Sequence, residues 1–431
     1  MTTQGRALRR RAPFLMLAAL ALLAGLDAAL LLLGLPAPVT TERLPEVHGI
    51  LLVIGFVGTL VSLERAVALK RAVGFAAPGL LGVGALVVLS PTPLRVGQVL
   101  LLLGAVALVA VYLPLWRRQR DEAVAAQALG AMLAVGALLL WQSGVAVPTV
   151  LPWLVGFVVL TIGGERLELA RIAMGPNAGR DLLILGGLFA VSVGASLLWP
   201  ATVPLLGASL LVLVGWLASH DVARHTVRSQ GLPRFSAACL LAGYLWLGVA
   251  GATWLVGGAA GDGARYDAVV HAVFLGFTIS MIMAHAPVIL PAVLRRPLPY
   301  HPAFIGPAVL LHSALVLRLW GGDALGASWA WRWGGVLNGV AILAFVAVAV
   351  WSATRLRPVA RRAPGSTGDA VVAAEGAPAG VARAGVARAE VARAEVARAE
   401  VARAEVARAE GALVRDTDIA VDSRPASGIG R

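Results

Sequence analysis

Twelve apolar segments, separated by short connections, constrain this chain more than any other feature of its sequence. They cover approximately residues 13–35, 47–69, 76–92, 94–115, 123–143, 146–165, 182–199, 201–218, 235–258, 268–292, 302–320 and 331–354. Most of them reach the ~20 residues that a helix needs to cross a bilayer. Every backbone N–H and C=O group in hydrocarbon has to be paired internally. The segments therefore predict an all-α membrane protein with about twelve transmembrane helices.

The composition excludes two other classes of protein. Of the 431 residues, 59% are hydrophobic and 14% are charged, whereas a soluble globular chain carries about 25% charged residues. The net charge of +13 does not indicate a nucleic-acid partner, because the basic residues lie in short clusters between apolar segments and not on one face. We therefore expect the lipid bilayer as partner and no nucleic acid.

The basic residues also predict an orientation in the membrane. The connections on one side, together with both flanks of the apolar region, carry 20 Arg and Lys, and the other side carries five: Arg43, Arg95, Arg265, Arg318 and Arg332. Cytoplasmic connections are enriched in Arg and Lys, so both termini are expected to be cytoplasmic. The scarcity of Lys beside many Arg, Ala and Gly residues is typical of GC-rich bacterial genomes. The expected location is therefore a bacterial inner membrane.

The chain divides into a polytopic transmembrane domain, residues 1–357, and a cytoplasmic low-complexity tail, residues 358–431. Residues 381–410 are six copies of a five-residue unit, one VARAG followed by five VARAE. A period of five matches neither helix nor strand, so the valines cannot form one buried stripe. We expect an expanded repeat without a packed core; the alternative is a spacer or partner-binding helix.

Three apolar segments share a pattern and lie about four segments apart. In each, a Gly-Phe pair is followed after seven residues by ionisable side chains. The members are Gly55-Phe56 with Glu64-Arg65, Gly156-Phe157 with Glu165-Arg166, and Gly276-Phe277 with His285. Internal repeats of this kind indicate membrane architecture. They favour three pseudo-symmetric units of four helices over two units of six.

The second and tenth segments each begin with a histidine, His48 and His271. Along a helix His48 lies about 24 Å from Glu64, so the two histidines form an outer polar layer. Helical bundles commonly hold cofactors between facing helices, and neutral imidazole is a good axial ligand of haem iron. We therefore expect haem between His48 and His271. The alternative is a pair of hydrogen-bonded histidines at the membrane interface.

An inner polar layer contains Glu64, Glu165 and His285, together with Arg65 and Arg166. Ionisable residues inside a bilayer are functional-site candidates by default. One hypothesis is a metal or proton site formed by the two glutamates and His285. The other is a set of structural ion pairs, Glu64 with Arg166 and Glu165 with Arg65, because arginine suits carboxylate pairing.

Two further residues are candidates. Asp27 lies in the first segment. It is either a residue of a proton path or a capped polar group in a water-lined cleft. His312 lies in the eleventh segment, as a possible extra ligand.

With these residues the sequence resembles two membrane families. Twelve helices in three sets of four, with a histidine on the second and tenth, resemble the catalytic subunit of haem-copper oxidases. The stretch His271-Ala-Val-Phe-Leu-Gly276 resembles NnrS-type proteins, which are associated with haem, copper and nitric oxide stress. The resemblance covers residues 10–355. It implies a low-spin haem between His48 and His271, and a metal such as copper or iron near His285.

The sequence also departs from the oxidase pattern. That family places histidine ligands of copper on its sixth and seventh helices, whereas residues 146–165 and 182–199 contain no histidine. A binuclear oxygen-reducing centre is therefore not expected.

The expected function is haem binding with an electron-transfer or nitrosative-stress role and a possible redox partner, and not terminal-oxidase catalysis; whether the protein is an enzyme is left open. The alternative is a proton-coupled secondary transporter that uses Glu64, Glu165 and Asp27. The oligomeric state does not follow from the sequence.

Overall fold

The computed structural model describes residues 3–294 and 298–355 and confirms the expected fold class. Twelve helices in the described ranges are long and apolar enough to cross a membrane. The same ranges contain helices and turns but no strand. The protein is therefore an all-α polytopic membrane protein that lies in a lipid bilayer.

The first six spans come from nine helical elements. These are α1 (Thr3–Leu32), α2 (Arg43–Ile50), η1 (Leu51–Gly58), α3 (Thr59–Leu69), η2 (Ala72–Phe75), α4 (Ala76–Leu89), α5 (Leu94–Gln119), α6 (Glu122–Gln142) and α7 (Val147–Met174). The second span is one continuous helix, Arg43–Leu69, made of α2, η1 and α3.

The last six spans are likewise built from α-helices with short 3-10 or π-helical elements. Their elements are α8 (Ala178–Leu198), η3 (Pro200–Thr202), α9 (Val203–His220), α10 (Ala223–Thr226), α11 (Leu232–Gly257), α12 (Gly263–His271), η4 (Ala272–Ile279), α13 (Ser280–Leu294), η5 (Pro302–Phe304), α14 (Ile305–Val316), η6 (Leu317–Ala324) and α15 (Ser328–Arg355). The tenth span, Gly263–Pro291, contains α12, η4 and most of α13.

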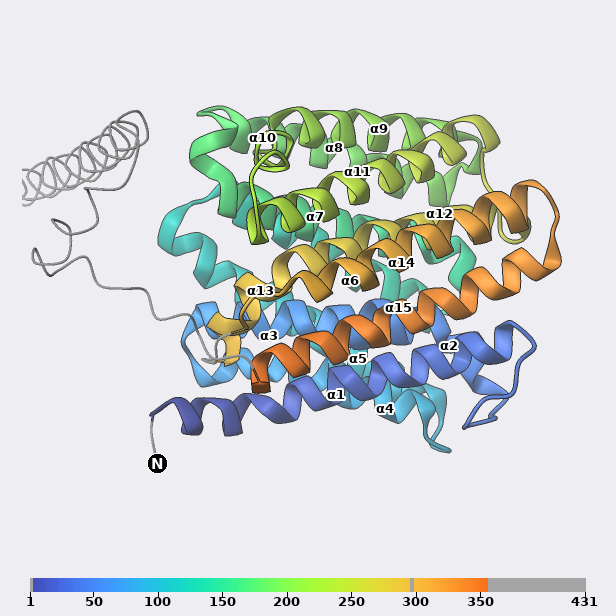
Figure 1. Ribbon diagram of the computed structural model, residues 1–431, viewed down its shortest axis with the longest axis horizontal. Helices are drawn as coiled ribbons and strands as arrows, with labels where there is room; N and C mark the ends of the chain where they lie inside the picture. Colours follow the sequence, from blue (N-terminus) through green and yellow to red (C-terminus); the bar gives the residue numbers. More distant parts are fainter. Residues whose placement is uncertain (1–2, 295–297, 356–431) are drawn as a thin grey trace, which may run out of the picture. The chain divides into compact units, whose positions relative to one another are not determined.

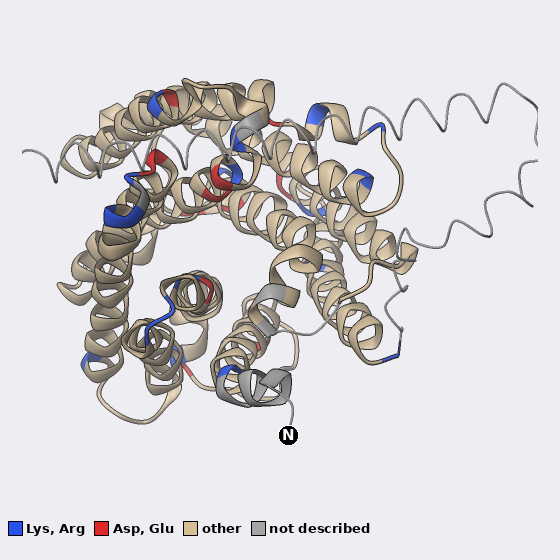
Figure 2. Ribbon diagram, turned by 90° about the vertical axis from the view of Figure 1, so that its left-hand side faces the viewer, with Lys and Arg blue, Asp and Glu red and all other residues tan. Residues whose placement is uncertain are grey.

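Consecutive spans run in opposite directions through one helical bundle (Figure 1). The start of α1 and the ends of α3, α5 and α7 therefore lie at the same end of the bundle, which we call the arginine-rich end. Figure 2 looks onto this end and shows Lys and Arg at several helix termini. The starts of α2 and α12 lie at the opposite end. His48 and His271 are therefore near the opposite end, and Glu64 and Glu165 are near the arginine-rich end.

Two members of the Gly-Phe repeat share a backbone distortion. Gly55-Phe56 lies in η1 and Gly276-Phe277 lies in η4, and both elements are π-helical. Gly156-Phe157 lies in the regular helix α7. The second and tenth spans are thus alike in backbone as well as sequence, while the sixth differs. The threefold pseudo-symmetry stays a prediction.

Glycines bring α6 and α7 close together near the arginine-rich end. A Cβ atom on Gly130 would lie 2.9 Å from the carbonyl oxygen of Phe157, and one on Gly164 would lie 2.6 Å from the carbonyl oxygen of Ala123. Small residues allow membrane helices to approach in this way, and van der Waals packing stabilises the contact. This approach carries the polar groups of α6 and α7 to a common interface.

The VARAE repeats and the rest of the expected tail fall in residues 356–431, outside the described residues. The expectation for the tail stays a prediction.

Candidate functional site

The two histidines of the expected outer layer are oriented in the same way. Nδ1 of His48 lies 2.9 Å from the carbonyl oxygen of Gly25 in α1, and Nδ1 of His271 lies 2.9 Å from the carbonyl oxygen of Asp267. A carbonyl oxygen only accepts hydrogen bonds, so each Nδ1 carries the hydrogen. In a neutral imidazole this leaves the lone pair on Nε2, the atom that a metal would bind.

Neither Nε2 atom has a hydrogen-bond partner among the described residues. The two rings come from different spans, the second and the tenth, and lie toward the same end of the bundle. A second-shell carbonyl that accepts from Nδ1 is the usual companion of a metal-ligating histidine. The side chains present therefore fit a haem with one axial imidazole from each span.

Asp267 connects His271 to a buried arginine. Nε and Nη2 of Arg318 donate to the two carboxylate oxygens of Asp267 at 2.8 and 2.7 Å. Oδ1 of Asp267 also lies 3.3 Å from Nδ1 of His271. The guanidinium of Arg318 lies 4.5 Å from the ring centre of Trp331. This arrangement holds Asp267 in place, and Asp267 in turn limits the rotation of the His271 ring.

The placement of Arg318 corrects an expectation from the sequence. The charge pattern assigns Arg318 to a connection, but it lies inside η6 and is only 5% exposed. The eleventh span runs from Pro302 to Ala324, beyond the apolar segment that ends near residue 320. Its partner Asp267 was also missed, although it precedes His271 by four residues, the spacing at which helical side chains meet.

Three π-helical elements carry or adjoin this site. His48 lies three residues before η1, His271 directly precedes η4, and Arg318 lies within η6. Single π-helical turns are rare and occur frequently at functional sites, where they re-aim side chains. This region is therefore the strongest functional candidate in the described part of the chain.

The other two candidates occupy separate places. Oδ2 of Asp27 accepts a hydrogen bond from the backbone N–H of Val39 at 3.1 Å, in the connection after α1. Nδ1 of His312 accepts one from Nε1 of Trp246 at 3.0 Å, between α14 and α11. His312 thus has a structural partner, and Asp27 lies at the end of the bundle opposite the inner layer.

The inner layer forms ion pairs, but not the expected ones. Arg65 donates to Glu64 at 2.5 Å and to Glu168 at 2.9 Å. Arg166 donates through Nε and Nη2 to Asp221, at 2.9 and 2.8 Å. The predicted pairs, Glu64 with Arg166 and Glu165 with Arg65, are wrong, because the two arginines point to different carboxylates. The sequence does not reveal which carboxylate lies on the facing side of a neighbouring helix.

Asp221 is the centre of a buried network. It follows α9, is fully buried, and also accepts a hydrogen bond from the Tyr244 hydroxyl at 2.7 Å. Burial alone would raise the pKa of the Asp221 carboxyl, but the hydrogen bonds and charge of Arg166, together with the Tyr244 hydroxyl, hold that pKa below its usual range. The carboxylate is therefore ionised at neutral pH.

Arg166 also forms a hydrogen bond with His285. Nη1 of Arg166 lies 3.1 Å from Nε2 of His285, and a guanidinium only donates, so Nε2 is the acceptor. Its lone pair is therefore not available to a metal in this arrangement. No group of three or more His, Cys, Asp or Glu side chains in residues 3–294 and 298–355 is placed to hold a metal ion. The arrangement gives no support to a metal site formed by Glu64, Glu165 and His285.

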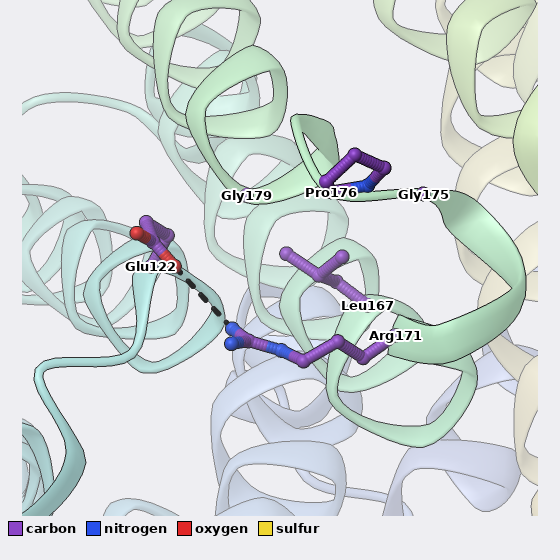
Figure 3. A pocket seen from close by; sticks show the side chains of 6 residues that line it. All are labelled: Glu122, Leu167, Arg171, Gly175, Pro176 and Gly179. Atoms are coloured by element: carbon purple, nitrogen blue, oxygen red, sulfur yellow. Dashed lines mark hydrogen bonds and ion pairs between the residues drawn. The ribbon is translucent and has the colours of Figure 1, made fainter.

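A pocket of about 350 Å³ lies at the arginine-rich end, where α7 turns into α8 (Figure 3). Its polar side chains are Glu122 and Arg171, whose Oε2 and Nη2 atoms are 3.4 Å apart. Arg171 also pairs with Asp121. The pocket contains none of the residues predicted from the sequence.

A family model described as a domain of unknown function (DUF8744) matches residues 11–354, the whole set of membrane spans. No curated protein and no solved structure matches the chain.

Proposed function

The chain belongs to the DUF8744 family, and we propose that it is a membrane protein that binds haem between His48 and His271. The observation that carries the proposal is the shared orientation of the two imidazoles. Each Nδ1 donates to a backbone carbonyl, and each Nε2 is left with its lone pair and without a partner among the described residues. The π-helical elements beside both histidines support it.

Axial ligation by two imidazoles favours an electron-transfer role. His48 and His271 would both hold the haem, which would then supply electron transfer and not substrate binding. The bound haem would supply a one-electron couple. Asp267, held by Arg318, keeps His271 oriented and strengthens it as a ligand. A nitrosative-stress role rests on the resemblance to NnrS-type proteins alone.

We place the protein in a bacterial inner membrane with both termini in the cytoplasm, because the arginine-rich end contains most of the basic residues. The haem site would then lie near the periplasmic face. A redox partner would reach it from that side.

The transporter alternative needs acidic residues along one path. Asp27 bonds to Val39 beyond the end of α1, whereas Glu64 and Glu165 lie near the arginine-rich end. These acids therefore occupy opposite ends of the bundle, and the geometry favours the haem proposal.

An absorption spectrum of the full-length protein, purified from haem-replete cells, tests the proposal. We expect a Soret band in the wild type and its loss in both His48→Ala and His271→Ala. His220→Ala, an exposed histidine at the arginine-rich end, is the matched control and should keep the band. A wild type without a Soret band would overturn the proposal.

A further inference from the structure

A second polar site, distinct from the proposed haem site, lies among α3, α5, α6 and α7 near the arginine-rich end. We call it the glutamate cluster: Glu64, Arg65, Tyr112, Gln127, Thr161, Glu165 and Glu168. We propose that the glutamate cluster is a proton-binding site, in which the carboxyl group of Glu165 holds and releases the proton. This goes beyond the proposed haem function and does not depend on it.

The first argument is the surroundings of Glu165. The residue is only 7% exposed, makes no hydrogen bond within the described residues, and its Oε1 atom is buried without a partner. A carboxylate in this state loses its hydration without a hydrogen bond in return, which disfavours the ionised form. A bound proton removes the charge and with it that cost.

The second argument is the balance of charges. Glu165 interacts electrostatically with Glu64 and Arg65 of α3 and with Glu168 and Arg166 of α7. Arg166 is committed to Asp221, and Arg65 is already bonded to Glu64 and Glu168. The three carboxylates Glu64, Glu165 and Glu168 therefore share one arginine, Arg65, which is bonded to two of them and not to Glu165. Excess negative charge in a low-dielectric interior is stabilised by a bound cation. A proton is the smallest cation that can bind to these carboxylates.

The third argument is a group of buried polar atoms on α5, α6 and α7, the helices of the glutamate cluster, that have no partner in the described part of the chain. The hydroxyl of Tyr112 and the Oε1 atom of Gln127 are buried and unpaired, and so is the hydroxyl of Thr161, one helical turn before Glu165. Tyr112 interacts electrostatically with Glu165, and the amide of Gln127 donates to Glu168 at 3.2 Å. Buried polar groups are paired as a rule. With Oε1 of Glu165 and Nε of Arg65, five unpaired polar atoms of the described residues belong to the glutamate cluster, and they indicate a site.

The exposed fractions of Glu168, Glu64 and Glu165 indicate the side from which a proton would reach the cluster. Side-chain exposure is 39% for Glu168 and 21% for Glu64, whereas Glu165 is 7% exposed. Glu168 lies one turn before Arg171, the last residue of the sixth span. A proton from the arginine-rich side thus meets the most exposed carboxylate first and Glu165 last.

A proton also fits better than a metal ion. No set of three His, Cys, Asp or Glu side chains in the described ranges is arranged to ligate a metal. Arg65 already occupies oxygen atoms of Glu64 and Glu168 that a metal would need.

Infrared spectroscopy of the full-length protein in lipid nanodiscs tests this proposal. A protonated carboxyl absorbs in a C=O stretching region of its own and shifts when H₂O is replaced by D₂O. We expect such a band in the wild type at neutral pH, its loss in Glu165→Gln, and its full amplitude in Glu122→Gln, the control from the exposed Glu122–Arg171 pair. Glu165→Gln mimics the protonated side chain, so its melting temperature should equal or exceed that of the wild type.

Two further variants keep the test decisive if Glu165→Gln is not recovered. Tyr112→Phe should keep the band and shift its frequency. Glu168→Gln should keep the band at neutral pH but lose it at a lower pH than the wild type on alkaline titration, because one neighbouring negative charge is gone. Absence of the band from the wild type at neutral pH overturns the proposal. So does a band of full size in Glu165→Gln, or displacement of the band by sodium at constant pH. All these readouts are independent of haem content.

Discussion

Nδ1 of His48 lies 2.9 Å from the carbonyl oxygen of Gly25, so α1, which contributes no ligand, orients a proposed haem ligand of the second span. Gly25 makes this contact possible, because a Cβ atom at that position would lie 2.4 Å from Cδ2 of Leu52 in η1. The first and second spans therefore pack tightly beside the carbonyl group that accepts from His48.

The first prediction concerns this contact. Gly25→Val should force α1 away from η1 and cost about 1–3 kcal/mol of stability, as overpacking does. The Gly25 carbonyl would move away from His48, so haem occupancy should fall as well. Melting temperature and Soret absorbance of the purified variant measure both effects. Gly187→Ala is the control, because a Cβ atom there meets nothing within 4 Å. Equal losses in the two variants would contradict the explanation.

The second prediction concerns Asp267. Asp267→Asn removes a charge that pairs with Arg318 and leaves His271 less firmly oriented. Second-shell changes of this kind typically weaken metal affinity by about 10- to 100-fold. We expect faster haem loss to an apoprotein acceptor, and a higher reduction potential because the imidazole loses a neighbouring anion. Asp262→Asn, an exposed residue before α12, should change neither quantity. An unchanged rate of haem loss in Asp267→Asn would show that Asp267 does not support the proposed haem ligand His271.

The third prediction concerns the buried pair of Arg166 and Asp221. Asp221→Asn leaves a buried guanidinium without its counter-charge, and loss of one partner of such a pair costs about 3–5 kcal/mol. Asp181→Asn breaks the exposed pair with Arg180, which should cost less than ~1 kcal/mol. Thermal unfolding in detergent compares the two variants. Similar melting temperatures would show that the Asp221 network does not stabilise the fold.

The pH dependence of the same pair has a defined sign. The folded-state pKa of Asp221 is lower than its unfolded value, so its contribution to stability is fully present above the unfolded pKa. The contribution is lost as pH falls through the folded-state pKa. The difference in melting temperature between wild type and Asp221→Asn should therefore be constant near neutral pH and shrink only in strong acid.

Much of the fold could be predicted from the sequence, because the bilayer allows so few structures. Twelve apolar segments in hydrocarbon have to be helices, and the structure has twelve such helices in its described ranges. The location of His48 and His271 toward the same end of the bundle could also be anticipated, since both lie near the start of an even-numbered span. The Nδ1 bond of His48 to Gly25 could not be predicted, because the sequence does not contain the distance between α1 and η1.

The ion pairs show where sequence reasoning fails. Spacing along a helix gives the depth of a charged residue but not the neighbouring helix that it faces. Arg65 and Arg166 were correctly placed among ion pairs, yet both were given the wrong carboxylates. Asp221 was missed because it follows the apolar segment of α9 and looks like a connection residue. Glu168 could have been found, since it lies three residues after Glu165, at helical spacing.

The fourth prediction concerns orientation. If the arginine-rich end faces the cytoplasm, green fluorescent protein fused after residue 357 should fluoresce. Alkaline phosphatase inserted between α11 and α12, at the opposite end, should be active. The exchanged fusions, with each reporter at the other position, are the controls and should be silent. The reverse pattern would place the proposed haem site on the cytoplasmic side and contradict the proposed topology.

The most direct test of the central claim is electron paramagnetic resonance of the oxidised full-length protein. Two axial imidazoles give a low-spin ferric signal, so we expect that signal in the wild type. Removal of either ligand should abolish that signal, together with the bound haem, in His48→Ala and in His271→Ala alike, while His312→Ala keeps the low-spin form. A low-spin signal that survives unchanged in both His48→Ala and His271→Ala, or a wild type without any haem signal, would contradict the account.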